Sequence, residues 1–324
     1  MDNRRSFLKK AGLFGTTLIA GSSQLGTAME LFVPQKISEI GLQLFTLRDE
    51  LDKDVRSTLQ KIAKIGYNHV ETFYNYKENT PASYWGLDVK QLKALLKTNK
   101  LKTYSGHYQL NDFLTKGNGN DEALKIQLEI AAELGQQYFI IPIPPLALWD
   151  KLTRSDYQFM AEQLNKAGEL SAKYKIKTGY HNHFWEFRAL DNGEKGYDIL
   201  LKDTNPKLVS FELDLFWIEK SGIDPLHYFN KYPGRFPMWH IKDMNKANTQ
   251  KITGANFDQK NSREIFSGIS YAEVGAGSIN YKGLFKDQFK AGLKHIFVEQ
   301  DVIKIDPFAS ITQSYNYVKA NLVK

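Results

Sequence analysis

The chain has 324 residues, a formal net charge of +7 and 42% hydrophobic residues. This apolar content is ample for a large core and argues against a disordered chain. The sequence contains no cysteine, which excludes disulfides, thiol nucleophiles and thiolate metal ligands. Any metal ion must therefore be bound by His, Asp or Glu side chains.

The first 28 residues have the pattern of an export signal. A basic start precedes a short apolar run, and small residues lead up to Ala28. Residues 4–9, RRSFLK, resemble a twin-arginine signal. The apolar run is shorter than the roughly 20 residues that span a bilayer, and there is no cysteine for a lipid anchor. We therefore expect removal of residues 1–28, a connector over residues 29–38 and a soluble periplasmic protein without a stable membrane anchor; an ordinary amphipathic helix is the alternative.

The charge of the remaining chain is small. Residues 1–28 hold four Arg or Lys and one acid, so their removal would lower the net charge to +4. The other lysines are scattered among acids, whereas a nucleic-acid-binding protein usually has a clustered basic face. We therefore expect no nucleic-acid partner.

From residue 39 onward, apolar β-rich runs alternate with amphipathic helical patterns. One helical pattern, residues 120–135, has its leucines on one side and Gly135 as a stop signal. Eight runs have the strand pattern: 39–47, 69–73, 101–108, 137–142, 176–184, 208–216, 238–244 and 295–301. Eight such pairs without a break in composition predict a single α/β domain over residues 39–324, a (β/α)8 TIM barrel with a parallel eight-stranded barrel.

Two segments exceed what a minimal barrel needs. Residues 142–149 are rich in proline and predict a rigid loop after the fourth strand. Residues 245–280 follow the seventh strand and are rich in Gly, Asn, Ser and Thr. Loops that follow the strands lie at the barrel mouth, so this segment is expected to cover the substrate or to meet another subunit. Its glycines in VGAGSIN favour a tight turn over phosphate binding.

Histidines gather at one end of the predicted barrel. The carboxyl ends of TIM-barrel strands carry the chemistry, and the opposite ends carry stability. His69 and His295 begin their strands and are expected to be structural, while His227 lies in a helical pattern. The other four of the seven fall at carboxyl ends: His107, His181, His183 and His240.

Acids occur at the same height as these histidines, because Asp214 and Glu299 also lie near the carboxyl ends of predicted strands. Neighbouring strands lie about 4.8 Å apart, so side chains from strands five to eight can converge on one ion. Two imidazoles and two carboxylates left unpaired would be costly to bury. Any one of these residues, considered alone, could instead be a buried side chain that is satisfied by hydrogen bonds and binds no metal. We expect one divalent ion, with Mn, Zn, Co or Fe favoured over Ca or Mg, bound by His181, Asp214, His240 and Glu299.

Further candidates share the inward face, because strand residues two apart point the same way. His183 follows His181 in this way, and Lys242 follows His240. A neighbouring cation would lower the pKa of Lys242 and make it a base, whereas a salt bridge to Glu212 is the structural alternative.

Strands one to three, and the residues just past Asp214, add other candidates. His107 is a second candidate proton carrier. Gln43, Glu71 and Trp217 are candidates for contact with a sugar, and their structural alternatives are satisfied interior polar groups or core packing.

Seven motifs in order resemble the xylose isomerase-like barrel superfamily, in its sugar phosphate isomerase/epimerase branch. They are IGLQLFTLRDEL, GYNHVETF, YHNHFWEF, LDLFW, WHIKDM, VGAGSINY and VEQD, and they span nearly the whole chain after the leader. The resemblance implies a metal held by Glu, Asp, His and Glu from strands five to eight. Asp214, His240 and Glu299 match the last three. At the first position this chain has His181-Asn182-His183, which is closer to inosose dehydratase.

The resemblance implies a metal-dependent sugar isomerase or epimerase. It would act on a keto sugar by α-proton abstraction through a metal-stabilised enediolate, with Glu299 both ligand and acid/base. Because the strand-five glutamate is absent, β-elimination by a dehydratase or 3-keto-glycoside lyase is the alternative. A non-catalytic periplasmic sugar-binding protein is the alternative from another class, and an apurinic endonuclease would need more ligands and a basic groove. A homo-oligomer is compatible with the sequence.

Overall fold

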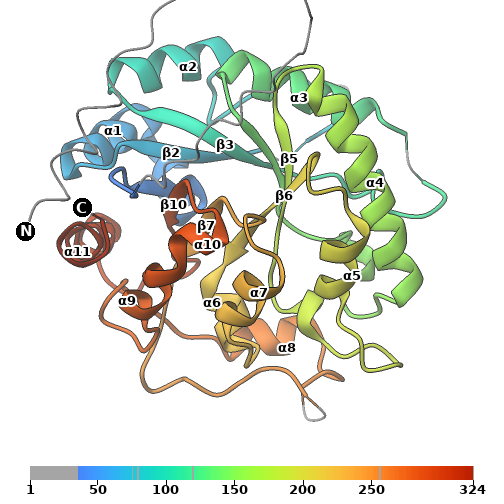
Figure 1. Ribbon diagram of the computed structural model, residues 1–324. Helices are drawn as coiled ribbons and strands as arrows, with labels where there is room; N and C mark the ends of the chain where they lie inside the picture. Colours follow the sequence, from blue (N-terminus) through green and yellow to red (C-terminus); the bar gives the residue numbers. More distant parts are fainter. Residues whose placement is uncertain (1–35, 75, 79, 119, 255–256, 324) are drawn as a thin grey trace, which may run out of the picture. The chain divides into compact units, whose positions relative to one another are not determined.

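Eight parallel strands form the centre of the molecule. The computed structural model describes residues 36–323 apart from 75, 79, 119 and 255–256, so the predicted export signal and most of the connector lie outside the described residues. In space the strands close in the order β1-β10-β7-β6-β5-β4-β3-β2 (Figure 1). They are β1 (Gly41–Gln43), β2 (His69–Tyr74), β3 (Lys102–Tyr108), β4 (Tyr138–Ile141), β5 (Lys177–His181), β6 (Val209–Asp214), β7 (Met238–Ile241) and β10 (His295–Val298). The closed parallel barrel confirms the predicted (β/α)8 fold.

Helices follow the strands and surround the barrel in Figure 1. The expected helix over 120–135 is observed as α3, and Gly135 ends it in the left-handed conformation. The α-helices are α1 (Arg48–Ile65), α2 (Val89–Thr98), α3 (Glu122–Leu134), α4 (Arg154–Ala172), α5 (Gly196–Asp203), α6 (Leu215–Lys220), α7 (Pro225–Lys231), α8 (Ser262–Ser267), α9 (Tyr281–Leu284), α10 (Gln288–Ala291) and α11 (Pro307–Asn321).

Several strands end earlier than the sequence pattern predicts. The run 39–47 is a strand only to Gln43, because the Gln43 side chain accepts a hydrogen bond from the Phe45 amide and starts a 3-10 helix (η1, Leu44–Leu47). The run 208–216 ends at Asp214, whose side chain caps α6 by accepting from the Trp217 amide. Candidate site residues thus also turn the chain away from the barrel.

The barrel interior is layered. A middle layer of apolar side chains consists of Tyr138, Ile140, Met238 and Phe297. Below it, at the amino ends of the strands, the ring of His69 lies 5.1 Å from that of Tyr104 and 5.8 Å from that of His295. The Tyr104 and His295 rings stack at 4.2 Å. These contacts are consistent with the structural role expected for both histidines.

The segment after β7 is fastened at both ends. Two short antiparallel strands, β8 (Asp243–Met244) and β9 (Tyr271–Ala272), pair near its ends. The expected tight turn in VGAGSIN wraps around the carboxylate of Asp243, which accepts from the amides of Gly275, Gly277 and Ile279 at 2.9–3.2 Å. A β-carbon on Gly277 would lie 2.2 Å from Asp243 Oδ1. The amides therefore bind a carboxylate of the chain itself, and only glycine fits at residue 277.

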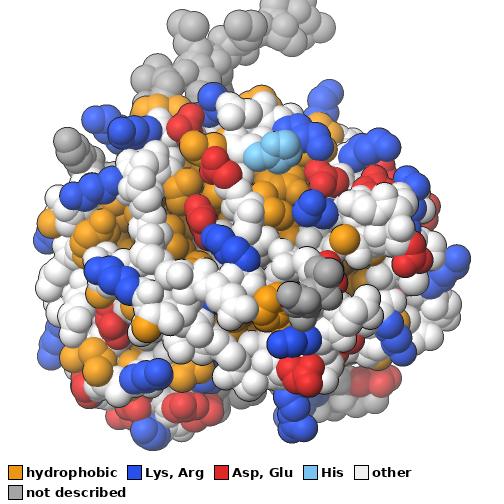
Figure 2. Space-filling model, turned by 90° about the horizontal axis from the view of Figure 1, so that it is seen from below, with side chains coloured by type: hydrophobic (Ala, Val, Ile, Leu, Met, Phe, Trp, Pro, Cys, Tyr) orange, Lys and Arg blue, Asp and Glu red, His pale blue; other side chains and the backbone are white. Residues whose placement is uncertain are grey.

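Charges of both signs are mixed on the surface seen in Figure 2, where Lys and Arg side chains are interspersed with Asp and Glu. Within the described part of the chain, none of the helices combines the length and the apolar character needed to cross a membrane.

Candidate functional site

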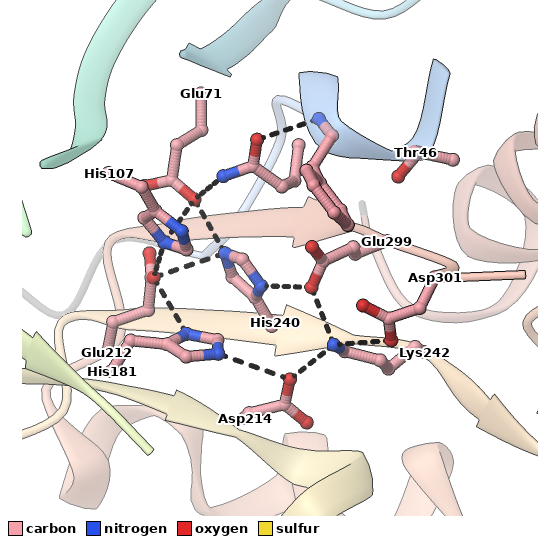
Figure 3. A network of polar contacts seen from close by, with 12 residues as sticks. Thr46, Glu71, His107, His181, Glu212, Asp214, His240, Lys242, Glu299 and Asp301 are labelled. Atoms are coloured by element: carbon pink, nitrogen blue, oxygen red, sulfur yellow. Dashed lines mark hydrogen bonds and ion pairs between the residues drawn. The ribbon is translucent and has the colours of Figure 1, made fainter. Parts of the chain in front are cut away.

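The strand register brings the predicted site residues together at the carboxyl ends of the barrel. Asp214 of β6 pairs with His240 of β7, and His181 of β5 pairs with Glu212 of β6. On the opposite side, Gln43 of β1 pairs with Glu71 of β2. Figure 3 shows the side chains of Glu71, His181, Glu212, Asp214 and His240 pointing toward one another inside the barrel.

The four predicted metal ligands form one cluster. His181, Asp214, His240 and Glu299 each offer a ligand atom, and these atoms lie within 4.8 Å of one another. The Nδ1 atom of His240 is 2.8 Å from Glu299 Oε2, and the Nε2 atom of His181 is 3.6 Å from Asp214 Oδ2. All four residues are at most 5% exposed. The geometry therefore provides two imidazoles and two carboxylates around one point.

A second group of side chains overlaps the first. His107, His181, Glu212 and His240 also lie within 4.8 Å of one another through their ligand atoms. Glu212 Oε2 is its centre, at 2.7 Å from His107, 3.0 Å from His181 and 3.1 Å from His240. The sequence placed Glu212 on the face of Asp214 but gave it only the role of a salt-bridge partner for Lys242. Its position two residues before Asp214 was the available signal.

Glu71 and Gln43 lie beneath this network and are both fully buried. Glu71 Oε2 accepts from Gln43 Nε2 at 2.7 Å and lies 2.6 Å from His240 Nε2. Ser105 donates to the other oxygen of Glu71. Both side chains predicted to contact a sugar are thus occupied with other protein groups and orient His240.

The carboxylates control the charge of the histidines. Burial opposes protonation of His240 and His107, but Glu212, Glu71 and, for His240, Glu299 outweigh it. The pKa of His240 is raised well above its usual value, and that of His107 is raised to about 9. Burial, followed by repulsion from His240, lowers the pKa of His181 well below its usual value. A metal ligand must be unprotonated, so His181 is ready to bind an ion, whereas on His240 an ion would replace a proton.

Lys242 differs from the sequence-based expectation in its partners and in its pKa. Its Nζ atom lies 3.0 Å from Asp214, 2.7 Å from Glu299 and 3.1 Å from Asp301, and the alternative partner expected was Glu212. Burial opposes its charge, but the three carboxylates outweigh burial and raise the pKa of Lys242 well above its usual value. The expectation of a lowered pKa considered only a neighbouring cation. In this arrangement Lys242 is an ammonium group and a proton donor.

Asp301 was missed by the sequence analysis. It lies two residues after Glu299, so the same period of two that located Lys242 could have found it. Its carboxylate contacts Lys242, and its backbone oxygen accepts from Arg48 Nη2 at 3.0 Å.

His183 is half-buried beside the cluster, with its ring 5.0 Å from that of His181 and 5.4 Å from that of Trp217. Its Nδ1 atom is buried and has no hydrogen-bond partner among the described residues. Burial and then repulsion from Lys242 lower the pKa of His183 well below its usual value. His183 is therefore a neutral imidazole with a free nitrogen.

A cavity of about 240 Å³ lies over these groups, and we call it the mouth cavity. His107, His181, His183, Glu299 and Asp301 line its polar side. Phe45, Phe73 and Trp149 line its apolar side, with Trp149 coming from the proline-rich loop. Trp217, expected as an apolar wall, is instead fully buried behind His183, with Lys242 Nζ 5.6 Å from its ring centre.

A second hydrophobic cluster supports this rim. It joins residues after β5 and β6 to the 245–280 segment, through Phe184, Trp185, Phe216, Trp217, Met244, Ile252, Ile265 and Tyr271. The long segment therefore packs beside the cavity on the side of His183.

Known proteins share both the sequence pattern and the fold. The family model of the xylose isomerase-like TIM barrel matches residues 59–300. Inosose dehydratase from Geobacillus thermodenitrificans is 26% identical over 253 residues, which are 72% of this chain and 80% of that protein.

Solved structures extend the likeness. A sugar phosphate isomerase/epimerase from Parabacteroides distasonis is 27% identical, with a TM-score of 0.73 over 89% of this chain and 96% of that chain. The IolI protein, solved with a bound zinc atom, shares the fold at 16% identity, with a TM-score of 0.63 over 88% of this chain and 98% of that chain.

Proposed function

This chain belongs to the xylose isomerase-like TIM barrel family, and from that premise we propose that it is a divalent-metal-dependent enzyme that removes the proton beside the carbonyl of a keto sugar or sugar derivative. The observation that carries the proposal is the cluster of His181, Asp214, His240 and Glu299 beneath the mouth cavity. The relatives support a sugar-processing enzyme of the isomerase/epimerase or lyase type.

The donor set fits a transition metal. Two imidazoles with two carboxylates suit Zn, Mn, Fe or Co, and Asp214 Oδ2 is buried without a hydrogen bond of suitable geometry among the described residues. His181, Asp214, His240 and Glu299 would hold the ion. A divalent ion bound there supplies positive charge that stabilises the negative charge developing on the substrate oxygen.

The chain's own residues would move the protons. We assign His183 as the base, since its imidazole is neutral and lines the cavity. Protonated Lys242 and His107 are the proton donors. General acid–base catalysis needs an unprotonated base and a protonated donor, and these residues are in those protonation states.

Elimination is the outcome that the site favours over epimerisation. Epimerisation needs a proton carrier on each face of the sugar, and the carboxylate that relatives place on strand five is replaced by His181. In an elimination, the electron pair of the broken C–H bond forms a double bond to the next carbon, and the C–O bond beyond it breaks. The oxygen leaves with its electron pair and takes a proton from Lys242 or His107. The dehydratase relative supports the same choice.

Isomerisation is the second candidate, because it shares the first proton transfer and one structural neighbour is named for it. Both candidates can be tested on purified protein treated with a chelator and then reconstituted with Zn, Mn, Co or Fe(II). We expect about one ion per chain, and release of water or aglycone from an inosose or a 3-keto-glucoside only after reconstitution.

The controls separate the outcomes. His181→Ala should lose both the ion and the activity, whereas His227→Ala, which changes an exposed side chain of α7, should keep both. Interconversion of a 2-ketose without release of a leaving group would favour the isomerase. Full activity of the metal-free protein would contradict the proposal.

A further inference from the structure

A second hollow lies beside the mouth cavity, and we call it the side cleft. Its volume is about 510 Å³, and it is lined by the start of α1 and by residues that follow β2. Three residues line both hollows: Phe45, Phe73 and Tyr74. The side cleft and the mouth cavity are therefore neighbours, separated by these aromatic side chains.

The side cleft combines aromatic surface with charged groups. The rings of Phe45 and Phe73 meet edge to face at 5.3 Å, and those of Phe73 and Trp85 at 5.5 Å. All three are half-buried, so part of each side chain remains accessible. Asp49 and Asp52 are exposed at the rim. Aromatic surface packs on the C–H face of a sugar ring, and charged groups at the edge bind its hydroxyls.

The backbone holds Trp85 in an unusual conformation. Its φ is 53°, in the left-handed region that residues other than glycine rarely adopt, and Gly86 follows at 83°. Two hydrogen bonds between Tyr84 and Leu87, at 2.8 and 2.9 Å, close this turn. Such strain persists only where surrounding structure enforces it, and it concentrates at ligand-binding sites. Here the turn places the indole against Phe73.

Arg48 connects the side cleft to the proton-donor group. Its guanidinium lies 4.4 Å from the ring centre of Phe45 and donates to the backbone oxygens of Phe45 and Asp301, both at 3.0 Å. The Asp301 carboxylate in turn contacts Lys242. A group bound in the cleft would therefore contact a side chain attached to the catalytic network.

Size distinguishes the two hollows. Pockets for drug-sized ligands occupy about 300–1,000 Å³. The mouth cavity alone falls below this range, whereas the side cleft falls within it. One sugar ring in the mouth cavity would leave the larger hollow free.

We propose that the side cleft is a second carbohydrate subsite, which binds the ring attached to the reacting sugar, so that the substrate is a glycoside of disaccharide size. This substrate class rests on the proposed function, since the mouth cavity must hold the reacting keto sugar. Trp85 is its specificity-determining residue.

Binding of unreactive sugars tests the subsite without requiring turnover. Calorimetry on zinc-loaded protein would compare glucose with cellobiose and maltose, two disaccharides that differ in linkage. We expect at least one disaccharide to bind about tenfold more tightly than glucose, which corresponds to about 1.4 kcal/mol. Trp85→Asn should remove that gain without changing the affinity for glucose, because Asn tolerates a positive φ.

Two further variants complete the design. Trp85→Phe should retain most of the gain, and Tyr174→Ala, which removes an exposed aromatic side chain elsewhere, should change nothing. Equal affinity for glucose and both disaccharides, or an unchanged gain in Trp85→Asn, would overturn the subsite. Absence of turnover with every keto sugar would instead count against the proposed function, since the binding measurement does not depend on it.

Discussion

At the carboxyl ends of the barrel strands His107 and His240 lie between glutamates, whereas at the amino ends His69 and His295 lie among aromatic rings. His69, His107 and His240 are buried and His295 is half-buried, and burial disfavours a charged imidazole at both ends. At the mouth the carboxylates reverse its effect, and the pKa of His107 is raised to about 9. At the amino end, burial and then repulsion from His295 lower the pKa of His69 to about 3, and burial and then repulsion from Lys294 lower that of His295 to about 4.

The comparison teaches that partners across the barrel, rather than depth, decide what a histidine does here. The same side chain is a charged member of a polar network at one end and a packed aromatic ring at the other. Substitutions of histidines at the carboxyl end should therefore affect activity, whereas substitutions at the amino end should affect stability.

The largest expected effect is on activity. His240→Ala should lower kcat/KM at least about 1,000-fold, equivalent to about 4 kcal/mol, because the variant loses a candidate metal ligand and the partner of Glu71 and Glu299. His295→Ala should leave kcat/KM within about twofold, since it removes only packing. Steady-state kinetics with whichever of the keto sugars in the reconstitution assay is turned over would measure both. Similar losses in the two variants would remove the functional distinction between the ends.

The next effect is on acid stability. The folded pKa of His69 is about 3 and the unfolded value is about 6.5, so its neutral form stabilises the fold above pH 6.5, and that stability is lost as the pH falls. Between pH 7.5 and 4 the loss should be about 3 kcal/mol. In His69→Leu, denaturant unfolding at several pH values should show a pH dependence smaller by that amount. An unchanged pH dependence would mean that His69 is protonated in the folded protein.

The third prediction concerns Glu186, a buried carboxyl near the mouth cavity, and asks whether it is neutral or ionised in the folded protein. This buried carboxyl accepts from Tyr180 and from the His183 amide, and burial raises its pKa to about 7. Because the folded pKa exceeds the unfolded value, the stability it contributes is complete below pH 4.5 and is lost as the pH rises. Glu186→Gln should abolish about 2 kcal/mol of this loss between pH 5 and 7, measured by urea unfolding. If the variant were less stable than the parent at pH 8, Glu186 would be stabilising as a carboxylate.

Ser105→Ala should have the smallest effect. It removes one hydrogen bond to Glu71, which retains Gln43, His107 and His240 as partners. We expect a loss of about 1 kcal/mol in unfolding free energy and a small decrease in the pKa of His107 followed by NMR titration, since Glu71 would be less firmly held. A loss above about 3 kcal/mol would show that the network depends on each member.

Much of the fold could be predicted, because apolar β-rich runs mark all eight barrel strands and alternate along the chain with helical patterns. The carboxyl ends of several strands were placed too late. In two of them Leu44 and Leu215 continue the apolar run while the chain already turns into helices. Apolar pattern cannot distinguish the last turn of a strand from the first turn of a buried helix.

The site was partly accessible from the sequence for a similar reason. Their positions near the carboxyl ends of four predicted strands placed His181, Asp214, His240 and Glu299 at one height, and the structure brings them together. The charge of Lys242 could not be predicted, because it depends on Asp214 of β6 and on Asp301 and Glu299, which follow β10. Trp217 was misplaced because sequence adjacency to Asp214 does not reveal that its ring lies behind His183.

The turn around Asp243 has a consequence for how this fold can vary. Asp243, the residue that follows Lys242, starts this segment and accepts hydrogen bonds from amides near its end. The stretch between is therefore a loop whose two ends are held together. Its exposed residues can change without displacing His240, whereas Ile252 and Ile265 are held in the hydrophobic cluster beside His183. Diversification of ligand preference can proceed in residues 246–270 while the reacting groups stay in register, and grafting that stretch between homologues is the natural way to transfer selectivity.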